Sequence, residues 1–328
     1  MKIMEISKNN EYVAFGFYDL NVTIYNLDKK TKDNSEIIKI NFINKINIKD
    51  NNNLNDSEQN EIDVINFSYD EKHILILINK TIINIYEINT AKLIFKSEKI
   101  KDINQTLFIS TKNDILLYSN DKIFVSSEIF KSADLMSIYE PAQKNDIQQI
   151  FFSDFFNLII LIPNSIREIE CINLTKKNKE FAIDIKEEIF SANISKTDEG
   201  KFLIINLSKN YPKIFLYDLE KRQFDKKYYG HTQKNDKIIC TFEGNKDQYI
   251  LCGSEDFMIY LWDRNISGLP KYQFKSHEKS LIGLGLINSS FLLSCDEDMV
   301  KIWTSYDIDD INFDKQNKNN LMEEEKIN

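Results

Sequence analysis

The chain has 328 residues, of which 42% are hydrophobic and 12% aromatic. This composition can bury a large core, so it excludes a disordered protein, a collagen and a small disulfide-stapled domain. Asp and Glu outnumber Lys and Arg by 51 to 42, which gives a formal charge of -9. Because a negative protein repels a phosphate backbone, we expect no nucleic-acid partner.

The cysteine content and the termini suggest where the protein works. The four cysteines are scattered and form no CxxC pair, so we expect no disulfide framework, no zinc site and a reducing compartment. No run of about 18 apolar residues occurs, and the N-terminus MKIMEISKNN lacks the apolar region of a secretory signal. We therefore expect a cytoplasmic protein, with the nucleus as the alternative, and no membrane partner.

Short runs of β-branched and aromatic residues recur in pairs along the chain, and each pair is typical of a β-hairpin. In chain order the pairs are Tyr12–Phe17 with Val22–Leu27, His73–Ile78 with Ile82–Ile88, Asp114–Tyr118 with Ile123–Ser126, Leu158–Ile162 with Glu168–Leu174, Phe202–Leu207 with Lys213–Leu219, Tyr249–Gly253 with Met258–Asp263, and Phe291–Cys295 with Met299–Thr304.

These hairpins recur roughly every 40 to 50 residues, and most follow another short apolar run such as Ile62–Phe67. This grouping predicts an all-β protein whose residues 1–306 form a single seven-bladed β-propeller. The alternative, two stacked β-sandwiches, does not account for strands grouped as three plus one. Continuous apolar runs such as LIILI fit strands covered on both faces, and the one plausible helix is Lys131–Tyr139.

Two segments lack apolar periodicity. We expect a disordered insertion at about 47–61 and a partly disordered acidic tail at 307–328. Two questions concern the ends of the ring. Either Ile308–Phe313 adds an outer strand to the last blade or ring closure is incomplete, and Met1–Ile6 either closes the ring or begins the first blade.

The most specific motif lies near the C-terminus. Gly230-His231 precedes a hairpin with Ser254-Glu255-Asp256 at its turn and Trp262-Asp263 at its end, which is the signature of a WD repeat. The next blade repeats this order with His277, Asp296-Glu297-Asp298 and Trp303, although its spacing leaves open whether Glu297 or Asp298 faces His277. We assign a buried structural network to seven residues: His231, Ser254, Asp256, Trp262, His277, Asp298 and Trp303.

The stretch from Phe202 to Trp303 resembles the WD-repeat subunit of the GID/CTLH ubiquitin ligase. The residues that carry the resemblance are Asn206, Leu207 and Ser208; Tyr229, Gly230, His231 and Gln233; Phe242 and Gly244; Gly253 through Asp256; and Tyr260, Trp262 and Arg264. The chain departs from the family pattern in two ways. Glu243 replaces the first Gly of an F-G-G motif, and the sequence starts at a strand without the LisH and CTLH helical segments.

The resemblance implies a substrate-recruiting or assembly subunit of such a ligase, with CTLH and RING subunits as partners. The residues themselves indicate a non-catalytic scaffold that binds proteins or peptides through the loops of its blades. We assign partner binding to Glu255, Phe257, Glu297, Lys234 and Lys237. The alternative is a structural WD-repeat component of a large cytoskeletal or ciliary assembly.

Other chemistry has weaker support. The sequence has no GxSxG, HExxH, GxGxxG or Walker motif, so we expect no enzyme, no cofactor and no metal. Cys240 and Cys252 sit on neighbouring strands, where inert packing is favoured over a functional thiol pair. The basic clusters Lys176–Lys179 and Lys221–Lys227 are interpreted as exposed loop charge, with a patch for an acidic partner as the alternative.

Overall fold

The structure is a computed structural model, and it describes residues 1–32, 35–49, 60–98, 100–109, 114–126, 135–141, 147–164, 168–207, 212–233, 238, 240–287 and 291–304. The regular elements of these residues are β-strands, apart from one short 3-10 turn, η1 (Asn245–Asp247). No helix in this part of the chain is long and apolar enough to cross a membrane.

The chain divides into two compact units. The first comprises Met1–Asp28 and Lys39–Lys186, and it holds four antiparallel sheets of four strands in the orders β1-β2-β3-β4, β5-β6-β7-β8, β12-β11-β10-β9 and β13-β14-β15-β16. The strands are β1 (Ile3–Ile6), β2 (Tyr12–Gly16), β3 (Asn21–Lys32), β4 (Ser35–Asn47), β5 (Ile62–Phe67), β6 (His73–Ile78), β7 (Ile82–Glu87), β8 (Leu93–Ser97), β9 (Ile103–Ile109), β10 (Asp114–Ser119), β11 (Lys122–Ser126), β12 (Met136–Tyr139), β13 (Ile147–Ser153), β14 (Leu158–Pro163), β15 (Ile169–Asn173) and β16 (Asn178–Ile183).

The second unit comprises Lys29–Ile38, at the tip of the β3–β4 hairpin, and Glu187–Asn328. Its described residues form two sheets of four strands and one of three. The strands are β17 (Ile189–Ile194), β18 (Phe202–Leu207), β19 (Lys213–Asp218), β20 (Gln223–Tyr229), β21 (Cys240–Glu243), β22 (Tyr249–Cys252), β23 (Met258–Asp263), β24 (Tyr272–Lys275), β25 (Gly283–Leu286), β26 (Phe291–Cys295) and β27 (Val300–Thr304).

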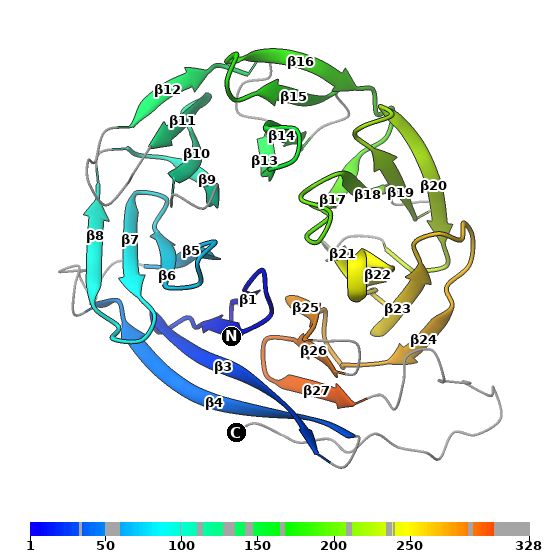
Figure 1. The fold of residues 1–328 in the computed structure, drawn as a ribbon, viewed down its shortest axis with the longest axis horizontal. Coiled ribbons are helices and arrows are strands. Elements are labelled where there is room, and N and C mark those ends of the chain that lie inside the picture. Colours follow the sequence, from blue (N-terminus) through cyan, green and yellow to red (C-terminus); the bar gives the residue numbers. More distant parts are fainter. Residues whose placement is uncertain are drawn as a thin grey trace. The chain divides into compact units, whose positions relative to one another are not determined.

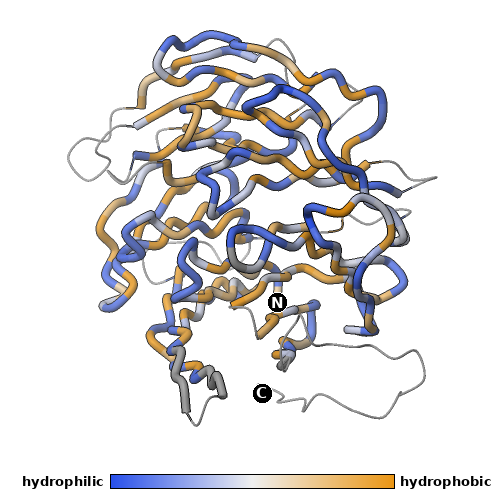
Figure 2. Tube along the Cα trace, turned by 45° about the vertical axis from the view of Figure 1, so that its right-hand side comes forward, coloured by the Kyte–Doolittle hydropathy of each residue, from blue (hydrophilic) through white to orange (hydrophobic). Residues whose placement is uncertain are grey.

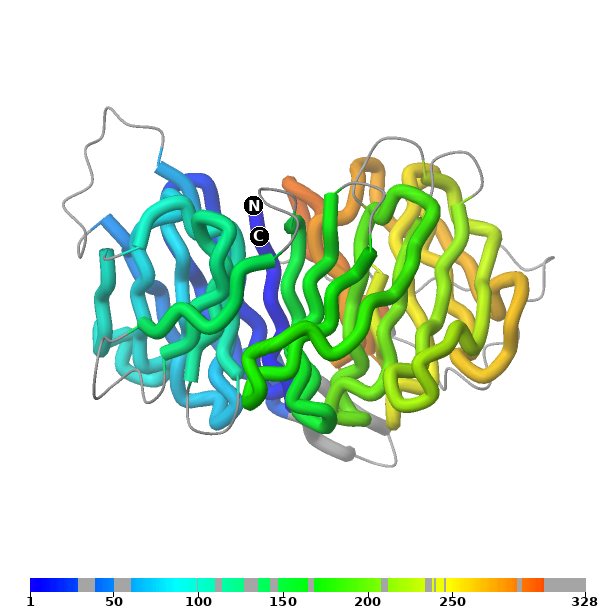
Figure 3. The backbone as a smooth tube through the Cα atoms, turned by 90° about the horizontal axis from the view of Figure 1, so that it is seen from above, coloured from blue at the N-terminus to red at the C-terminus, as the bar shows by residue number. Residues whose placement is uncertain are grey.

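Within each unit, successive sheets pack through their first strands. In the first unit β1 contacts β5, β5 contacts β9 and β9 contacts β13, while in the second β17 contacts β21 and β21 contacts β25. Figures 1 and 3 show the sheets of each unit following one another in chain order. Seven sheets of consecutive strands are the blades of a seven-bladed β-propeller, so the predicted fold class is confirmed.

Burial explains why the middle strands are continuously apolar. Every residue of β14 is buried, as are all but the first of β6, because neighbouring sheets cover both faces. The last strand of a sheet has one open edge and is more polar, so most residues of β20 are exposed. Figure 2 shows the resulting succession of hydrophobic strands and hydrophilic turns.

The structure corrects one element and locates others. The helix predicted over Lys131–Tyr139 is wrong, because Met136–Tyr139 is strand β12 and pairs with β11 as the outer strand of the third sheet. The N-terminal strand β1 pairs with β2 and so begins the first sheet. Most of the predicted insertion, residues 50–59, lies outside the described residues. The predicted tail and the possible outer strand Ile308–Phe313 also lie outside them, within 305–328. These expectations therefore stay predictions.

Candidate functional site

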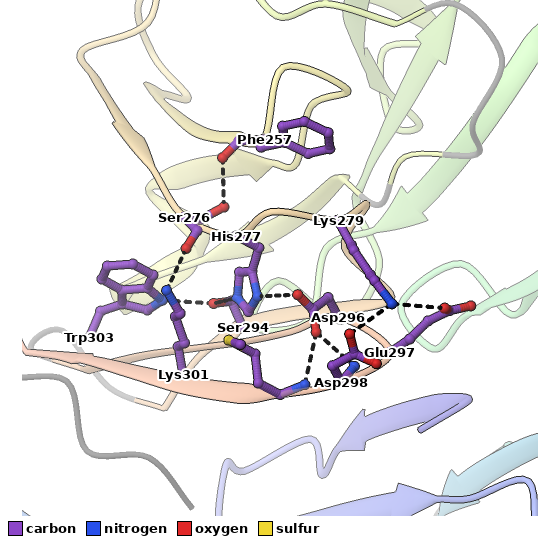
Figure 4. A network of polar contacts seen from close by, with 11 residues as sticks. Phe257, Ser276, His277, Lys279, Ser294, Asp296, Glu297, Asp298, Lys301 and Trp303 are labelled. Atoms are coloured by element: carbon purple, nitrogen blue, oxygen red, sulfur yellow. Dashed lines mark hydrogen bonds and ion pairs between the residues drawn. The ribbon is translucent and has the colours of Figure 1, made fainter.

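The seventh sheet contains a closed, buried polar network (Figure 4). His277 lies on the loop between β24 and β25, and its Nε2 atom is 2.8 Å from the hydroxyl of Ser294 on β26. Trp303 on β27 donates its indole N–H to the same hydroxyl at 2.7 Å. The other imidazole nitrogen of His277, Nδ1, is 3.0 Å from Asp296 Oδ2. The four side chains therefore link the incoming loop, the turn and two strands of one blade.

Asp296, rather than Asp298, is the acidic member of this network. Burial alone would raise the pKa of Asp296, but its carboxylate accepts hydrogen bonds from the N–H groups of Met299 and Asp298 and contacts His277, which together hold the pKa below its ordinary value. Asp298 is 61% exposed and pairs with Lys279 at 2.7 Å. The assignment of Asp298 to the buried network is therefore corrected, because the turn leaves only Asp296 within reach of His277.

The sixth sheet has the same tryptophan and histidine, but their partners differ. Trp262 donates its indole N–H to the carbonyl oxygen of Tyr229 at 3.0 Å. His231 Nε2 is 3.1 Å from Asn206 Oδ1, and the Asn206 amide donates to Gln233 Oε1 at 2.6 Å. Asn206 belongs to β18 of the fifth sheet, so this network joins two blades. The network of the seventh sheet, in contrast, is complete within its own blade and the loop that enters it.

A cysteine explains this difference. Trp262 pairs with Ile250 and Trp303 with Leu292, so Cys252 in the sixth sheet occupies the position that Ser294 holds in the seventh. Cys252 lies directly opposite Cys240 on β21, with their Cα atoms 4.1 Å apart, and a disulfide joins them. The interpretation of this pair as inert packing is therefore wrong, and His231 has no serine hydroxyl at that position to bind.

The disulfide leads to a testable expectation. Replacing Cys240 by Ala is expected to lower the free energy of unfolding by about 2 kcal/mol, because the link no longer restricts the unfolded chain. Thiol titration of the denatured, unreduced protein should find only Cys171 and Cys295 reactive, since these are the free cysteines. Cys171→Ala, at another buried site, is the control and should retain the link. Four reactive thiols in the denatured, unreduced protein would contradict the disulfide.

Ser254 and Asp256, which the sequence assigned to the same network, hold the turn of the sixth sheet instead. The Ser254 hydroxyl accepts a hydrogen bond from Thr232 N–H at 2.9 Å and donates to Thr232 C=O at 3.0 Å. Asp256 accepts from the Tyr260 hydroxyl at 2.6 Å and from Met258 N–H at 3.0 Å. These bonds fix the turn against the incoming loop that carries His231.

The fixed turns carry three of the five residues to which the sequence assigned partner binding. Phe257 is 37% exposed, and its carbonyl oxygen accepts a bond from the Ser276 hydroxyl, which ties the sixth blade to the loop entering the seventh (Figure 4). Glu297 is exposed and lies 3.8 Å from Lys279. Glu255 is half-buried on the same turn as Phe257. Lys234 and Lys237 lie outside the described residues, so their placement stays a prediction.

Sequence reasoning missed a second polar cluster, which joins three turns of the first unit. The Asp154 carboxylate accepts a hydrogen bond from the Tyr69 hydroxyl at 2.6 Å and pairs with Lys8 Nζ at 3.2 Å. The Lys8 ammonium also lies 4.3 Å from the centre of the Tyr69 ring. Burial, with help from Asp154, raises the pKa of the Tyr69 hydroxyl. Each of the three residues lies in the turn between the first and second strands of its sheet. Aligning the repeats and comparing this turn between them could therefore have identified the cluster from the sequence.

A related contact links the fifth and sixth sheets in the second unit. Glu243, which departs from the glycine of the family pattern, is 3% exposed and lies 3.6 Å from Lys196 Nζ. Burial raises the pKa of its carboxyl group, an effect that Lys196 and a hydrogen bond from Thr241 partly offset. Nearby, Asp247 accepts the N–H of Thr197 at 2.9 Å. Among the described residues, no group of three or more His, Cys, Asp or Glu side chains is placed to hold a metal ion.

Comparisons with known proteins agree with this architecture. No family model matches the chain. It is 28% identical over 191 residues to GID complex subunit 7 of Schizosaccharomyces pombe, a match that covers 56% of this chain and 35% of the relative. It is 33% identical over 141 residues to the WD repeat-containing protein WDS homolog of Arabidopsis thaliana, covering 42% of this chain and 26% of the relative. It is also 30% identical over 121 residues to human DDB1- and CUL4-associated factor 5, a match that covers 31% of this chain and 12% of the relative.

The seven sheets, the His-Ser-Asp-Trp network of the last blade and these relatives together define a WD-repeat β-propeller protein. Its similarity to the GID complex subunit is partial, because the chain spans about a third of that relative's length and less of the other two.

Proposed function

We propose that this protein is a non-catalytic interaction adaptor that recruits substrates to, or helps to assemble, a ubiquitin ligase of the GID/CTLH type. The observation that carries the adaptor role is the surface formed by the turns of the sixth and seventh blades. There Phe257, Glu297 and Asp298 are exposed, while the hydrogen bonds beneath them fix the backbone. Side chains presented on a rigid backbone lose little conformational freedom when a partner binds.

The names of the relatives support the ligase assignment. GID complex subunit 7 and DDB1- and CUL4-associated factor 5 are both named for protein assemblies, and the first matches more than half of this chain. Propellers host many unrelated roles, so the choice of assembly rests on this similarity and on the motifs between Asn206 and Arg264 rather than on the fold.

Affinity purification of the tagged full chain from its own cells, followed by mass spectrometry, tests the proposal. Recovery of RING-type and CTLH-domain subunits is expected. Recovery of cytoskeletal or ciliary proteins without those subunits would contradict the ligase assignment and favour a structural role.

A matched pair of variants tests the surface. Phe257→Asp is expected to reduce recovery of the partners at least about tenfold, because truncation or polar replacement of a central aromatic contact commonly has this effect. The backbone at Phe257 is left-handed, with a φ of 64°, and Asp tolerates this conformation. Phe155→Asp is the control, since Phe155 is 46% exposed on a turn of the first unit. Equal loss with both variants would show that the assigned surface is not specific.

A further inference from the structure

Large apolar side chains are exposed together at the outer strands of the fifth and sixth sheets. Leu269 and Ile266 are 79% and 65% exposed on the loop that follows β23, and Phe224 and Tyr229 on β20 are 44% and 39% exposed. These four residues account for about a third of the exposed large apolar side chains among the described residues. We call these four residues together with Lys227 the outer patch. Apolar exposure concentrated in this way marks interaction surfaces.

The loop that carries Ile266 and Leu269 is held firmly against β20. Tyr229 donates its N–H to Gly268 C=O at 3.0 Å, and Gly268 donates to Lys227 C=O at 2.9 Å, which forms a parallel bridge. At the start of the loop, Arg264 pairs with Asp198 at 3.0 Å, and the Tyr228 hydroxyl donates to the Arg264 carbonyl oxygen. The exposed aliphatic side chains are therefore presented on a preorganised backbone.

The two segments that carry the outer patch are basic although the chain is acidic. Residues 221–227 and 264–275 contain seven Lys and Arg residues and one Asp, in a protein whose formal charge is -9. Three of these cations pair with carboxylates: Lys221 with Asp218, Lys226 with Asp225 and Arg264 with Asp198. Lys227 has no carboxylate partner among the described residues. Its ammonium lies 5.2 Å from the ring centre of Phe215 and 5.1 Å from that of Tyr229. These cation–π contacts position the ammonium group to bind an anion of a partner.

The open edge of β20 indicates the form of the ligand. Within the described structure, β20 pairs with β19 on one side and on the other with Gly268 alone, so the edge at Gln223–Lys226 carries no neighbouring strand. An exposed strand edge can accept an extended peptide through main-chain hydrogen bonds, while side-chain contacts provide specificity. A peptide is favoured over nucleic acid because the most exposed apolar side chains of the patch, Leu269 and Ile266, are aliphatic and offer no ring on which a base could stack.

We propose that the outer patch binds an extended segment of a partner protein in which acidic and aliphatic residues alternate. The segment lies along the open edge of β20, places its carboxylates at Lys227 and packs its aliphatic side chains on Ile266 and Leu269. This binding site is separate from the turns that carry Phe257, and it does not depend on which assembly the chain joins.

Fluorescence anisotropy with a labelled short peptide in which Asp alternates with Leu tests this proposal on the full chain. We expect saturable binding that weakens as the NaCl concentration rises, because salt screens the contact with Lys227. The double change Ile266→Ser and Leu269→Ser, and separately Lys227→Glu, should each weaken binding at least about tenfold. Backbone N-methylation of the peptide should have a similar effect, since it blocks strand addition.

Matched controls lie in the first unit. Ile94→Ser replaces another exposed aliphatic residue, and Lys72→Glu reverses another exposed charge; both should leave binding unchanged. Circular dichroism confirms that each variant is folded, which is expected because the altered side chains are exposed.

Several outcomes would overturn the proposal. They are absence of binding, equal binding of a peptide with Ser in place of Leu, and undiminished binding by the outer-patch variants. Tighter binding of oligouridylate or of vesicles containing phosphatidylserine, lost in the same variants, would also overturn it and assign the patch to RNA or to a membrane. None of these results would alter the recovery of ligase subunits in the purification experiment, so the two proposals can fail separately.

Discussion

Replacing Trp262 by Ala is expected to lower the free energy of unfolding of the second unit by about 3 to 5 kcal/mol. The Trp262 side chain is fully buried in a cluster with Tyr228, Tyr260 and the linked cysteines. Its removal leaves a large cavity between the fifth and sixth sheets and breaks the indole bond to Tyr229 C=O. Urea unfolding followed by fluorescence measures the change, because Trp303, the remaining tryptophan, lies in the same unit.

Leu269→Ala is the matched control for this experiment. Leu269 is an apolar side chain of the same unit but is 79% exposed, so its truncation should change the free energy of unfolding by no more than about 0.5 kcal/mol. If the unfolding midpoint of Trp262→Ala equals that of the unchanged protein, the packing of the sixth blade around this tryptophan is incorrect.

Acidification is expected to remove up to about 3 kcal/mol of stability through His231, since each unit of pKa shift corresponds to about 1.4 kcal/mol. Burial lowers the pKa of His231 from 6.5 to about 4, although the negative charge of Asp256 opposes this effect. Between these two pH values the unfolded chain binds a proton that the folded chain does not. Stability is therefore complete above pH 6.5 and is lost progressively as the pH falls to about 4.

Unfolding free energies of the protein and of His231→Gln, measured from pH 7 to pH 4, check this expectation. Other groups titrate in both proteins, so the quantity to compare is the difference between the two curves. That difference should shrink on acidification, because only in the unchanged protein does proton uptake by the His231 imidazole stabilise the unfolded chain. Parallel curves for His231→Gln and the unchanged protein would contradict a buried, neutral His231.

Part of the candidate site was predictable from spacing. His277 and Trp303 were assigned to one network from their order along a single repeat, and the structure places both against Ser294. Asp298 was the wrong acidic member because the seventh sheet has one residue fewer between its serine position and its tryptophan. In this shorter turn, the Asp296 carboxylate caps two backbone N–H groups and still reaches His277.

Other features depended on which strand lies opposite or beside another. The disulfide requires the register that places Cys240 opposite Cys252, and spacing along the sequence does not specify this register. The bond between His231 and Asn206 requires two adjacent sheets to pack together. The contact between Lys8 and Asp154 joins residues 146 positions apart.

The sequence by itself determined the seven hairpins, their grouping into seven repeats and the identity of the two well-formed blades, because short apolar runs and turn residues act over a few neighbouring positions. Only the tertiary structure decided which polar groups meet. Buried donors and acceptors pair with whatever the packed sheets bring within about 3 Å. In the sixth blade that partner was Asn206 from the neighbouring sheet, because Cys252 stands where the seventh blade has Ser294.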